Sequence, residues 1–520
     1  MPRPLVIGLD IGTTGCKAVA LDSAGRVIDA THGTYPLQTP QPGWAQQDVH
    51  QIDRAVSKAL RTLMNRLGQA NLQALAFSGA MHSLMAAEPS GRPLSAAMTW
   101  ADNRAAGIAA ELHRQVDATD LYRHTGCPLT TNYHVARLRW WLARHRGFVP
   151  HRTLFVGIKD WLLHRLTGIW AMDFSLASAT GLFDLHRLEW YVPALAAAHV
   201  KADHLPPLVA PESVAGAVTP SAARRTGLPA GLPVIAGASD GALANLGSGA
   251  VRAGQTIVTI GTSGAVRRIV EEPRLDGPAR GAVKGDNCPR TWCYVLTNAR
   301  YFCGGAINNG GLAVQWVCEH FFEGSYEALM QAAETIEPGA GGLLALPYFT
   351  GERSPYWSAD ARAALLGLNL SHSKAHLARA ILEGVAFCIA DVWDAVQQVD
   401  PCPATSARLT GGITRSPLWA QILADVLGIA LHPIEAADAS AIGAAMLGHA
   451  AIGSAASMEA IALHLPSPGP PIRPRPNRHG QYQSIRRQYV AAARKVLFDP
   501  EGRFEAPAPA RVPGTRPDNR

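Results

Sequence analysis

A short apolar segment near the N-terminus, interrupted by a turn of glycine and threonine, constrains the fold of this chain more than any other feature. Residues 5–11 are apolar apart from Asp10, the turn is Gly12-Thr13-Thr14-Gly15, and a second apolar run follows Lys17. Two such runs around a turn of this kind predict a β-hairpin. Its tip offers N–H groups, two hydroxyls, a carboxylate and a cation, which together suit a polyphosphate held with Mg²⁺. The alternative is a surface hairpin whose turn binds nothing.

The same pattern occurs a second time in the middle of the chain. Asp10-Ile-Gly-Thr-Thr-Gly15 matches Thr259-Ile-Gly-Thr-Ser-Gly264, and both turns lie between apolar runs. Two copies near the starts of two chain halves predict a duplicated architecture, with paired phosphate loops that face one cleft. The repeat favours the phosphate-binding interpretation, because two chance matches in register are much rarer than one.

Several polar side chains follow predicted buried strands, where α/β sheets commonly bind ligands. Asp240 follows the apolar run 233–239 and precedes a helix, so it is either a helix cap or a general base. His82 follows the strand 72–77, and a hydrogen-bonded loop histidine is its simpler interpretation. Trp100 follows another apolar strand and is either a stacking wall for a sugar or a core residue.

Apolar periodicity also predicts several helices and the ends of the chain. Residues 49–67, 376–396 and 417–427 have the spacing of amphipathic helices, and 439–453 is a helix of small residues suited to tight packing. A nucleotide base could lie against Gly411-Gly412. Near the C-terminus we expect a Pro-rich linker over 466–480, a helix over 482–498 and a disordered tail over 500–520.

Composition excludes several classes of protein. The chain has 520 residues, so it should form more than one domain, and no apolar run approaches the ~20 residues of a membrane helix or has the pattern of a signal peptide. Its 8 cysteines contain no C-x-x-C pair, which indicates reduced thiols and a cytoplasmic location. The net charge of +7 belongs to residues 473–520, with 11 basic and 4 acidic residues, and does not indicate nucleic-acid binding by the body.

The paired turns resemble those of the actin/Hsp70/sugar-kinase superfamily, and the chain is similar to FGGY carbohydrate kinases from Val6 to about residue 453. No G-x-x-x-x-G-K-[ST] loop is present, which excludes a P-loop NTPase. Ala363-Ala-Leu-Leu-Gly-Leu368 with His376-Leu-Ala-Arg-Ala-Ile-Leu-Glu383 fits the C-terminal signature of the family. The resemblance implies an α/β fold of two RNase H-like (actin-type ATPase) domains with a central interdomain cleft, and ATP with Mg²⁺ as cofactors. We expect an N-terminal domain over 1–245, a C-terminal domain over 246–465, and a linker, helix and tail over 466–520.

The resemblance also implies roles for individual residues. Asp240 corresponds to the catalytic base, and Asp10 and Asp240 to the residues beside the metal. The residues at the nucleotide are Asp10, Thr13, Thr14, Lys17, Gly261, Thr262, Gly311, Gln315, Gly412 and Ser416. The residues at the sugar are Met81, His82, Trp100, Arg104 and Tyr133.

Within the family the chain is most similar to the gluconokinase branch. The segments that resemble this branch are 173–181, Ser239-Asp-Gly241, 306–311 and Gly351-Glu-Arg-Ser-Pro355. Xylulose and glycerol kinases place Asn or Gln directly after the catalytic Asp, whereas Gly241 has no side chain to bond a sugar hydroxyl. We therefore expect ATP-dependent phosphorylation of D-gluconate to 6-phosphogluconate, with Asp240 as general base on the primary hydroxyl.

Other functions stay open at this point. A kinase for xylulose or another pentulose is the closest alternative, and a non-catalytic sugar sensor is a remoter one. ATP-driven chaperones and filament proteins share the paired loops but carry peptide-binding or polymer surfaces, for which the sequence gives no signal. The expected partner is a small sugar or sugar acid, with no nucleic acid or membrane, and the chain could form a homodimer. Arg104, His82 and Lys159 are unranked candidates for binding the gluconate carboxylate.

Overall fold

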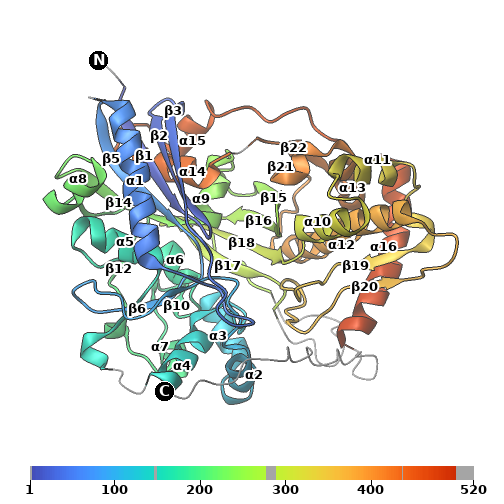
Figure 1. The fold of residues 1–520 in the computed structure, drawn as a ribbon, viewed down its shortest axis with the longest axis horizontal. Helices are drawn as coiled ribbons and strands as arrows, with labels where there is room; N and C mark the ends of the chain where they lie inside the picture. Colours follow the sequence, from blue (N-terminus) through green and yellow to red (C-terminus); the bar gives the residue numbers. More distant parts are fainter. Residues whose placement is uncertain (1–2, 69, 146–148, 277–288, 436, 499–520) are drawn as a thin grey trace.

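The computed structural model describes residues 3–68, 70–145, 149–276, 289–435 and 437–498. It consists of two lobes, each built on a six-stranded mixed sheet with helices packed on it (Figure 1). The predicted α/β class and duplicated, actin-type architecture are confirmed. No helix in these ranges is long and apolar enough to cross a membrane. The expected disordered tail, 500–520, lies outside the described residues.

Five strands of the two sheets repeat one topology. In each, an antiparallel hairpin and a third antiparallel strand adjoin two parallel strands, and the sixth, antiparallel strand lies at opposite edges of the two sheets. In sheet order, the first sheet contains β13 (Val214–Ala217), β14 (Pro233–Ser239), β5 (Leu72–Gly79), β1 (Leu5–Ile11), β2 (Gly15–Asp22) and β3 (Val27–Thr34). In sheet order, the second contains β17 (Trp292–Thr297), β18 (Arg300–Ile307), β16 (Gly264–Val270), β15 (Thr256–Ile260), β21 (Ser406–Thr410) and β22 (Ala430–Pro433). The matched pairs β1–β2 and β15–β16 are the two hairpins predicted from the repeated motif.

One face of the first sheet is covered by helices that include α1 (Val49–Leu67), α5 (Ile158–Thr167) and α8 (Pro220–Thr226). The helix α1 spans the predicted residues 49–67. It begins at Asp48, whose carboxylate accepts the N–H groups of His50 and Gln51, and it ends at Gly68. Its apolar stripe is buried against the sheet, as the periodicity predicts.

The other face of the first sheet carries α9 (Asp240–Gly247) and α14 (Ala439–Ala451), which lie between the two sheets in Figure 1. Glycines make this packing close: a Cβ on Gly8 would lie 1.8 Å from the Ala441 oxygen, and a Cβ on Gly443 would lie 2.0 Å from the Leu243 oxygen. The tight packing predicted for the small-residue helix is therefore confirmed. Although α14 follows the second sheet in sequence, it rests on the first, so the two lobes share a core.

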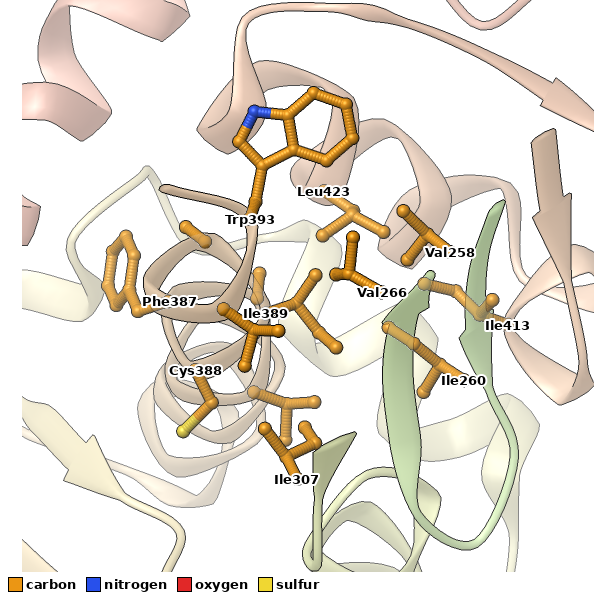
Figure 2. Close-up of a cluster of buried hydrophobic side chains, with 14 of the residues drawn as sticks. Val258, Ile260, Val266, Ile307, Phe387, Cys388, Ile389, Trp393, Ile413 and Leu423 are labelled. Carbon is orange, nitrogen blue, oxygen red and sulfur yellow. The ribbon is translucent and has the colours of Figure 1, made fainter. Parts of the chain in front are cut away.

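The second sheet packs against α10 (Gly311–Phe321), α12 (Lys374–Val399) and α13 (Pro417–Leu427). Figure 2 shows the centre of this core, where Val258, Ile260 and Val266 of the hairpin meet Ile389 and Trp393 of α12. All five side chains are at most 5% exposed. Such burial of branched and aromatic side chains is the main stabilising contribution to a domain. It also fixes the second turn rigidly at the end of the hairpin.

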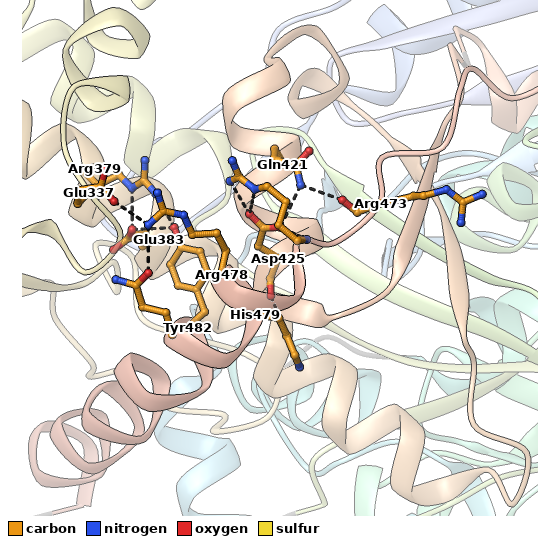
Figure 3. A network of polar contacts seen from close by, with 11 residues as sticks. Glu337, Arg379, Glu383, Gln421, Asp425, Arg473, Arg478, His479 and Tyr482 are labelled. Carbon is orange, nitrogen blue, oxygen red and sulfur yellow. Dashed lines mark hydrogen bonds and ion pairs between the residues drawn. The ribbon is translucent and has the colours of Figure 1, made fainter.

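The C-terminal helix α16 (Pro476–Phe498) begins earlier than predicted, so the expected linker 466–480 is wrong over its last residues. The reason is a tertiary contact: the backbone N–H and guanidinium of Arg475 bind the buried Asp425 of α13 at 2.7 and 2.6 Å. Farther along α16, the Tyr482 hydroxyl donates to Glu383 of α12 at 2.9 Å and accepts from Arg379 at 2.6 Å (Figure 3). The helix thus holds α12 and α13 in place, and the start of α13 lines the same cavity as the second turn.

The remaining elements are shorter. The strands are β4 (Gln46–Gln47), β6 (Met85–Ala87), β7 (Ala97–Met98), β8 (Leu154–Val156), β9 (Met172–Asp173), β10 (Phe183–Asp184), β11 (Glu189–Trp190), β12 (Leu208–Val209), β19 (Leu344–Leu346) and β20 (Ala364–Leu366). The helices are α2 (Ala106–Gln115), α3 (Ala118–Thr125), α4 (His134–Arg144), α6 (Phe174–Ser178), α7 (Val192–Ala198), α11 (Tyr326–Glu334), α15 (Met458–Ala462) and the single turns η1 (Pro150–Arg152), η2 (Ala202–His204), η3 (Ala340–Gly342) and η4 (Gly412–Arg415). A small core around α2, α4 and α7 forms the lower part of the first lobe (Figure 1).

Candidate active site

The first turn has carbonyl oxygens that accept hydrogen bonds from side chains of its own lobe, which leaves its N–H groups pointing away from that lobe. The Tyr35 hydroxyl donates to the carbonyl oxygens of Gly12 and Gly15 at 2.8 and 2.9 Å, and the Gln47 amide donates to that of Thr13 at 2.7 Å. Within the described chain, the N–H groups of Thr13 and Thr14 donate to no protein group. Adjacent N–H groups that are left free in this way form an anion-binding concavity.

The second turn is supported by the start of α10. A Cβ on Gly310 would lie 2.6 Å from the Ser263 oxygen, and a Cβ on Gly311 would lie 2.7 Å from the Gly261 oxygen. The Gly311 N–H donates to that Gly261 oxygen at 2.6 Å. These contacts place the helix N-terminus, with its partial positive charge, directly behind the turn. Only glycine permits an approach this close.

Two carboxylates of the first lobe face one cavity of about 260 Å³, which Thr259 and Gly411 of the second lobe also line. Burial raises the pKa of Asp10 to about 6, opposed by a 2.6 Å hydrogen bond from Ser78 and reinforced by repulsion from Asp240. Burial likewise raises the pKa of Asp240, which accepts the N–H groups of Gly241 at 2.7 Å and Met81 at 3.4 Å. Two desolvated carboxylates that repel each other have the chemistry of a divalent-cation site. Among the described residues, no cluster of three or more His, Cys, Asp or Glu forms a protein-only metal cage.

Asp240 occupies the position that the sequence predicts, at the first residue of α9. Ser239 caps that helix through the N–H of Ala242, so the carboxylate of Asp240 is not consumed as the cap. The helix N-terminus favours its ionised form, whereas burial favours its neutral form. The carboxylate is therefore free to accept a proton from a group that enters the cavity.

A second, larger cavity of about 910 Å³ lies in the second lobe beyond the turn. Its size is that of a small-molecule site, and Tyr326, Met330 and Trp419 give it apolar walls. The six residues predicted to hold the nucleotide in this lobe all line it: Gly261, Thr262, Gly311, Gln315, Gly412 and Ser416. Neighbouring residues line the two cavities, Gly411 the carboxylate cavity and Gly412 this one.

Four of the five predicted sugar residues gather beside Asp240 and the first turn. Met81 donates its N–H to Asp240, and His82 stacks edge-on against Tyr133 at a centroid distance of 5.1 Å. The Trp100 indole N–H donates to the Thr13 hydroxyl at 3.2 Å. His82 has φ of 63°, a left-handed conformation that is uncommon outside glycine and typical of functional sites.

The fifth, Arg104, has a different environment. Its Nε lies 2.8 Å from both Asp102 oxygens, one Nη donates to Gln46 at 2.9 Å, and the guanidinium stacks on Trp44 at 3.7 Å. The side chain is only 5% exposed. Arg104 thus stabilises the loop after β7, and its role at the sugar stays a prediction.

Three further residues lie at the candidate site and were not singled out from the sequence. Arg137 of α4 is fully buried and donates to the carbonyl oxygens of Thr131, His82 and Asp102, so it positions the loops that carry the sugar residues. Arg267 of β16 lines the carboxylate cavity, and Arg353 lies over the Trp100 ring at 5.0 Å. The available signal was weak: Arg137 and Arg267 lie in segments with further arginines, and Arg353 lies in a loop, so the sequence does not show which of these cations the fold buries.

Comparisons with known proteins agree with this arrangement. Residues 5–247 match the N-terminal domain, and residues 256–452 the C-terminal domain, of the FGGY family of carbohydrate kinases. The gluconokinase of Bacillus subtilis is 34% identical over 467 residues, which cover 88% of this chain and 89% of that protein. Solved structures of a gluconate kinase and a ligand-bound xylulose kinase, both from Lactobacillus acidophilus, each superpose with a TM-score of 0.88 and 28% identity. They cover 96% of this chain and 99% and 100% of their own.

Proposed function

Because the chain belongs to the FGGY family of carbohydrate kinases, we propose that it transfers the γ-phosphoryl group of ATP to the primary hydroxyl of D-gluconate, giving 6-phosphogluconate. The observation that carries the proposal is Asp240, a partly buried carboxylate free to accept a proton, in a cavity that is also lined by Asp10 and Thr259, which precede the two turns. The family uses ATP, and the free N–H groups of the first turn fit its phosphates.

The proposed reaction needs little covalent participation by the protein. Asp240 accepts the proton of the substrate hydroxyl as its oxygen bonds to the γ-phosphorus, and the bond from that phosphorus to the bridging oxygen of ADP breaks. The two turns and Arg267 donate hydrogen bonds to the phosphate oxygens as charge develops on them. Mg²⁺ held beside Asp10 and Asp240 would neutralise phosphate charge.

The preference for gluconate rests on Gly241 and on the relatives. A Cβ on Gly241 would lie 2.7 Å from the Met81 Cε and 3.4 Å from the Arg267 Nε, so the space beside Asp240 is filled without a side chain at 241. An amide at this position, as expected in xylulose and glycerol kinases, would have to displace Met81. The relative with 34% identity is named a gluconokinase, which agrees with this argument.

Xylulose is the competing substrate. The ligand-bound xylulose kinase superposes as closely as the gluconate kinase does, so the overall fold does not distinguish the two. Both substrates offer a primary hydroxyl to Asp240, but only gluconate carries a negative charge.

A panel of substrates tests the proposal directly. Purified protein with ATP and Mg²⁺ is given D-gluconate, D-xylulose, glycerol or D-glucitol, and ADP release is followed. We expect gluconate to give the highest kcat/KM, with a phosphomonoester on C6 in the ³¹P NMR spectrum. A higher kcat/KM with xylulose would overturn the choice of substrate. Binding of gluconate by calorimetry with no ADP release would identify a sensor instead.

A further inference from the structure

The buried cations around the predicted sugar residues differ in whether a carboxylate neutralises them. Lys159 Nζ is 2.6 Å from Asp173 and donates to the Ala236 oxygen at 2.7 Å, and Arg104 is held by Asp102. Both cations are therefore occupied within the protein. A sugar acid could pair with either only by breaking a buried ion pair, which is costly.

His82 supplies no positive charge. Burial, followed by repulsion from Arg137, holds the pKa of His82 well below its usual range, so the ring is neutral at pH 7. Its Nδ1 donates to the Ala179 oxygen at 2.9 Å, which leaves Nε2 as an acceptor. Such a ring suits a sugar hydroxyl rather than a carboxylate.

Arg353 is a third cation in the same region. Among the described residues, no carboxylate oxygen lies within 4.0 Å of its guanidinium, and its buried Nε has no hydrogen-bond partner. Burial lowers its pKa, opposed by Glu352. The charge lies over Trp100 and is close enough to His82 to contribute to the lowered pKa of that ring. A partly buried arginine with an unbonded Nε is stabilised when an anion completes the site.

The segment that carries Arg353 is held firmly in place. The Asn308 N–H donates to the Glu352 carboxylate at 2.6 Å, and the Asn309 amide donates to the Gly351 oxygen at 2.8 Å. The Ser354 N–H donates to Ala306 of β18 at 3.0 Å, and an Nη of Arg353 donates to Ile307 at 3.2 Å. Arg353 therefore reaches from the second lobe to the sugar residues of the first on a rigid support, as specific recognition requires.

We propose that Arg353 binds the carboxylate of the sugar acid, and that it is the residue by which this kinase distinguishes an acid from a neutral sugar. The inference rests on the proposed function. Arg267 also has a buried Nε without a hydrogen-bond partner, but it interacts with Asp240 and belongs to the end where phosphate is transferred. In gluconate the carboxylate is on C1 and the reacting hydroxyl is on C6, so two separate cations serve the two ends.

Arg353→Met tests the proposal, with D-glucitol as the matched neutral ligand because it replaces the carboxylate by a CH₂OH group. We expect kcat/KM for gluconate to fall about 10- to 100-fold, mostly through KM, as for loss of a charge-assisted hydrogen bond. The kcat/KM for glucitol, or its Ki against gluconate if it is not turned over, should change less than about threefold, and the KM for ATP should not change. Arg353→Lys should recover part of the preference.

Arg104→Met is the matched control, since it removes another buried arginine near the same residues. It should lower the Tm, because Asp102 loses its partner, without changing the ratio of gluconate to glucitol affinity. An equal loss for gluconate and glucitol in Arg353→Met would show that Arg353 supports the site as a whole and overturn the proposal. So would a lower kcat at unchanged gluconate KM, or a raised KM for ATP, either of which would assign Arg353 to phosphate. If the wild-type protein shows no preference for gluconate over the neutral sugars, that result would instead contradict the proposed function, and this inference with it.

Discussion

The two glycine turns have almost the same sequence, yet they join their strands in different registers. In the first hairpin Ile11 pairs with Cys16, so Asp10 lies opposite Lys17. In the second Ile260 pairs with Gly264, so Thr259 lies opposite Ala265. Since side chains alternate between faces of a strand, this offset of one residue decides which side chain faces the cleft.

The consequence is a division of charge between the two hairpins. In the second, Arg267 shares the face of Ala265 and donates to Thr259 at 3.3 Å, whereas Val266 enters the core. In the first, Lys17 is 44% exposed and its Nζ is 3.0 Å from Asp438. Asp10 and Asp240 of the first lobe thus supply carboxylates to the candidate site, and Arg267 of the second supplies a cation. A repeated motif can carry different chemistry in its two copies.

Asp240→Asn removes the proposed base and tests whether a carboxylate of the first lobe accepts the proton of the substrate hydroxyl. We expect kcat to fall ~10²–10⁴-fold, the usual contribution of a general base, because an amide cannot accept the hydroxyl proton. The KM for ATP should stay close to wild type, since the two turns are unchanged. Steady-state kinetics with gluconate gives both values. A kcat close to that of the wild type would show that Asp240 is not the general base.

Arg267→Met and Lys17→Met compare the cations of the two hairpins. Loss of Arg267 should lower kcat about 10²-fold or more, as for loss of a donor to the developing charge of a transition state. Loss of Lys17 should lower kcat by a smaller factor, because its ammonium group is half-exposed and already paired with Asp438. Equal losses in single-turnover measurements would mean that the register difference has no functional consequence.

Much of this arrangement could be predicted from the sequence, because it depends on local pattern. The apolar runs predict both hairpins, the stripe of α1 predicts its bounds, and the run before Asp240 places that residue at a helix N-terminus. The register of the hairpins could not be predicted, because it depends on which side chains the rest of the fold buries. Arg267 and Arg268 illustrate the difficulty, since they are neighbours in sequence and one faces the cavity while the other pairs with Asp400.

Asp10→Asn should change activity and stability in opposite directions, because the Asp10 carboxylate is proposed to serve the reaction but destabilises the first hairpin when it is ionised. Burial raises the folded-state pKa of Asp10 from 3.8 to about 6, so the ionised form destabilises the fold above pH 6. The variant should therefore have a higher Tm than the metal-free wild type at pH 8, and this gain should shrink as the pH falls through 6 and vanish below 4. Its activity should be low and should require more Mg²⁺. A variant less stable than wild type at pH 8 would contradict the assigned pKa shift.

The wild-type pH profile tests the same carboxylates without a mutation. In the proposed mechanism Asp10 and Asp240 act in their ionised forms, and burial raises the pKa of each. The kcat/KM for gluconate should then fall as the pH drops through about 6, well above the ordinary carboxyl value of 3.8. The Asp240→Asn variant should keep its residual rate over the same range if Asp240 dominates this limb. An acid limb below pH 4.5 would contradict the raised pKa values, because kcat/KM reports the enzyme before gluconate binds.

Gly241→Ala should have the smallest effect of these substitutions. It tests whether the space between Met81 and Arg267 has room for one added methyl group. The new Cβ would lie 2.7 Å from the Met81 Cε, the end of a flexible side chain, and 3.4 Å from the Arg267 Nε. Met81 can move aside, so we expect the KM for gluconate to rise about tenfold or less, the cost of one misplaced methyl group in a pocket. Stability should not fall, because alanine is favoured over glycine in a helix. Gly241→Ala with Met81→Ala should recover the KM by returning the space. If the double variant does not recover the KM, the methyl group added at position 241 acts by displacing Arg267 rather than Met81. The position of Arg267 on the second hairpin would then depend on residue 241 of the first lobe as well as on the strand register.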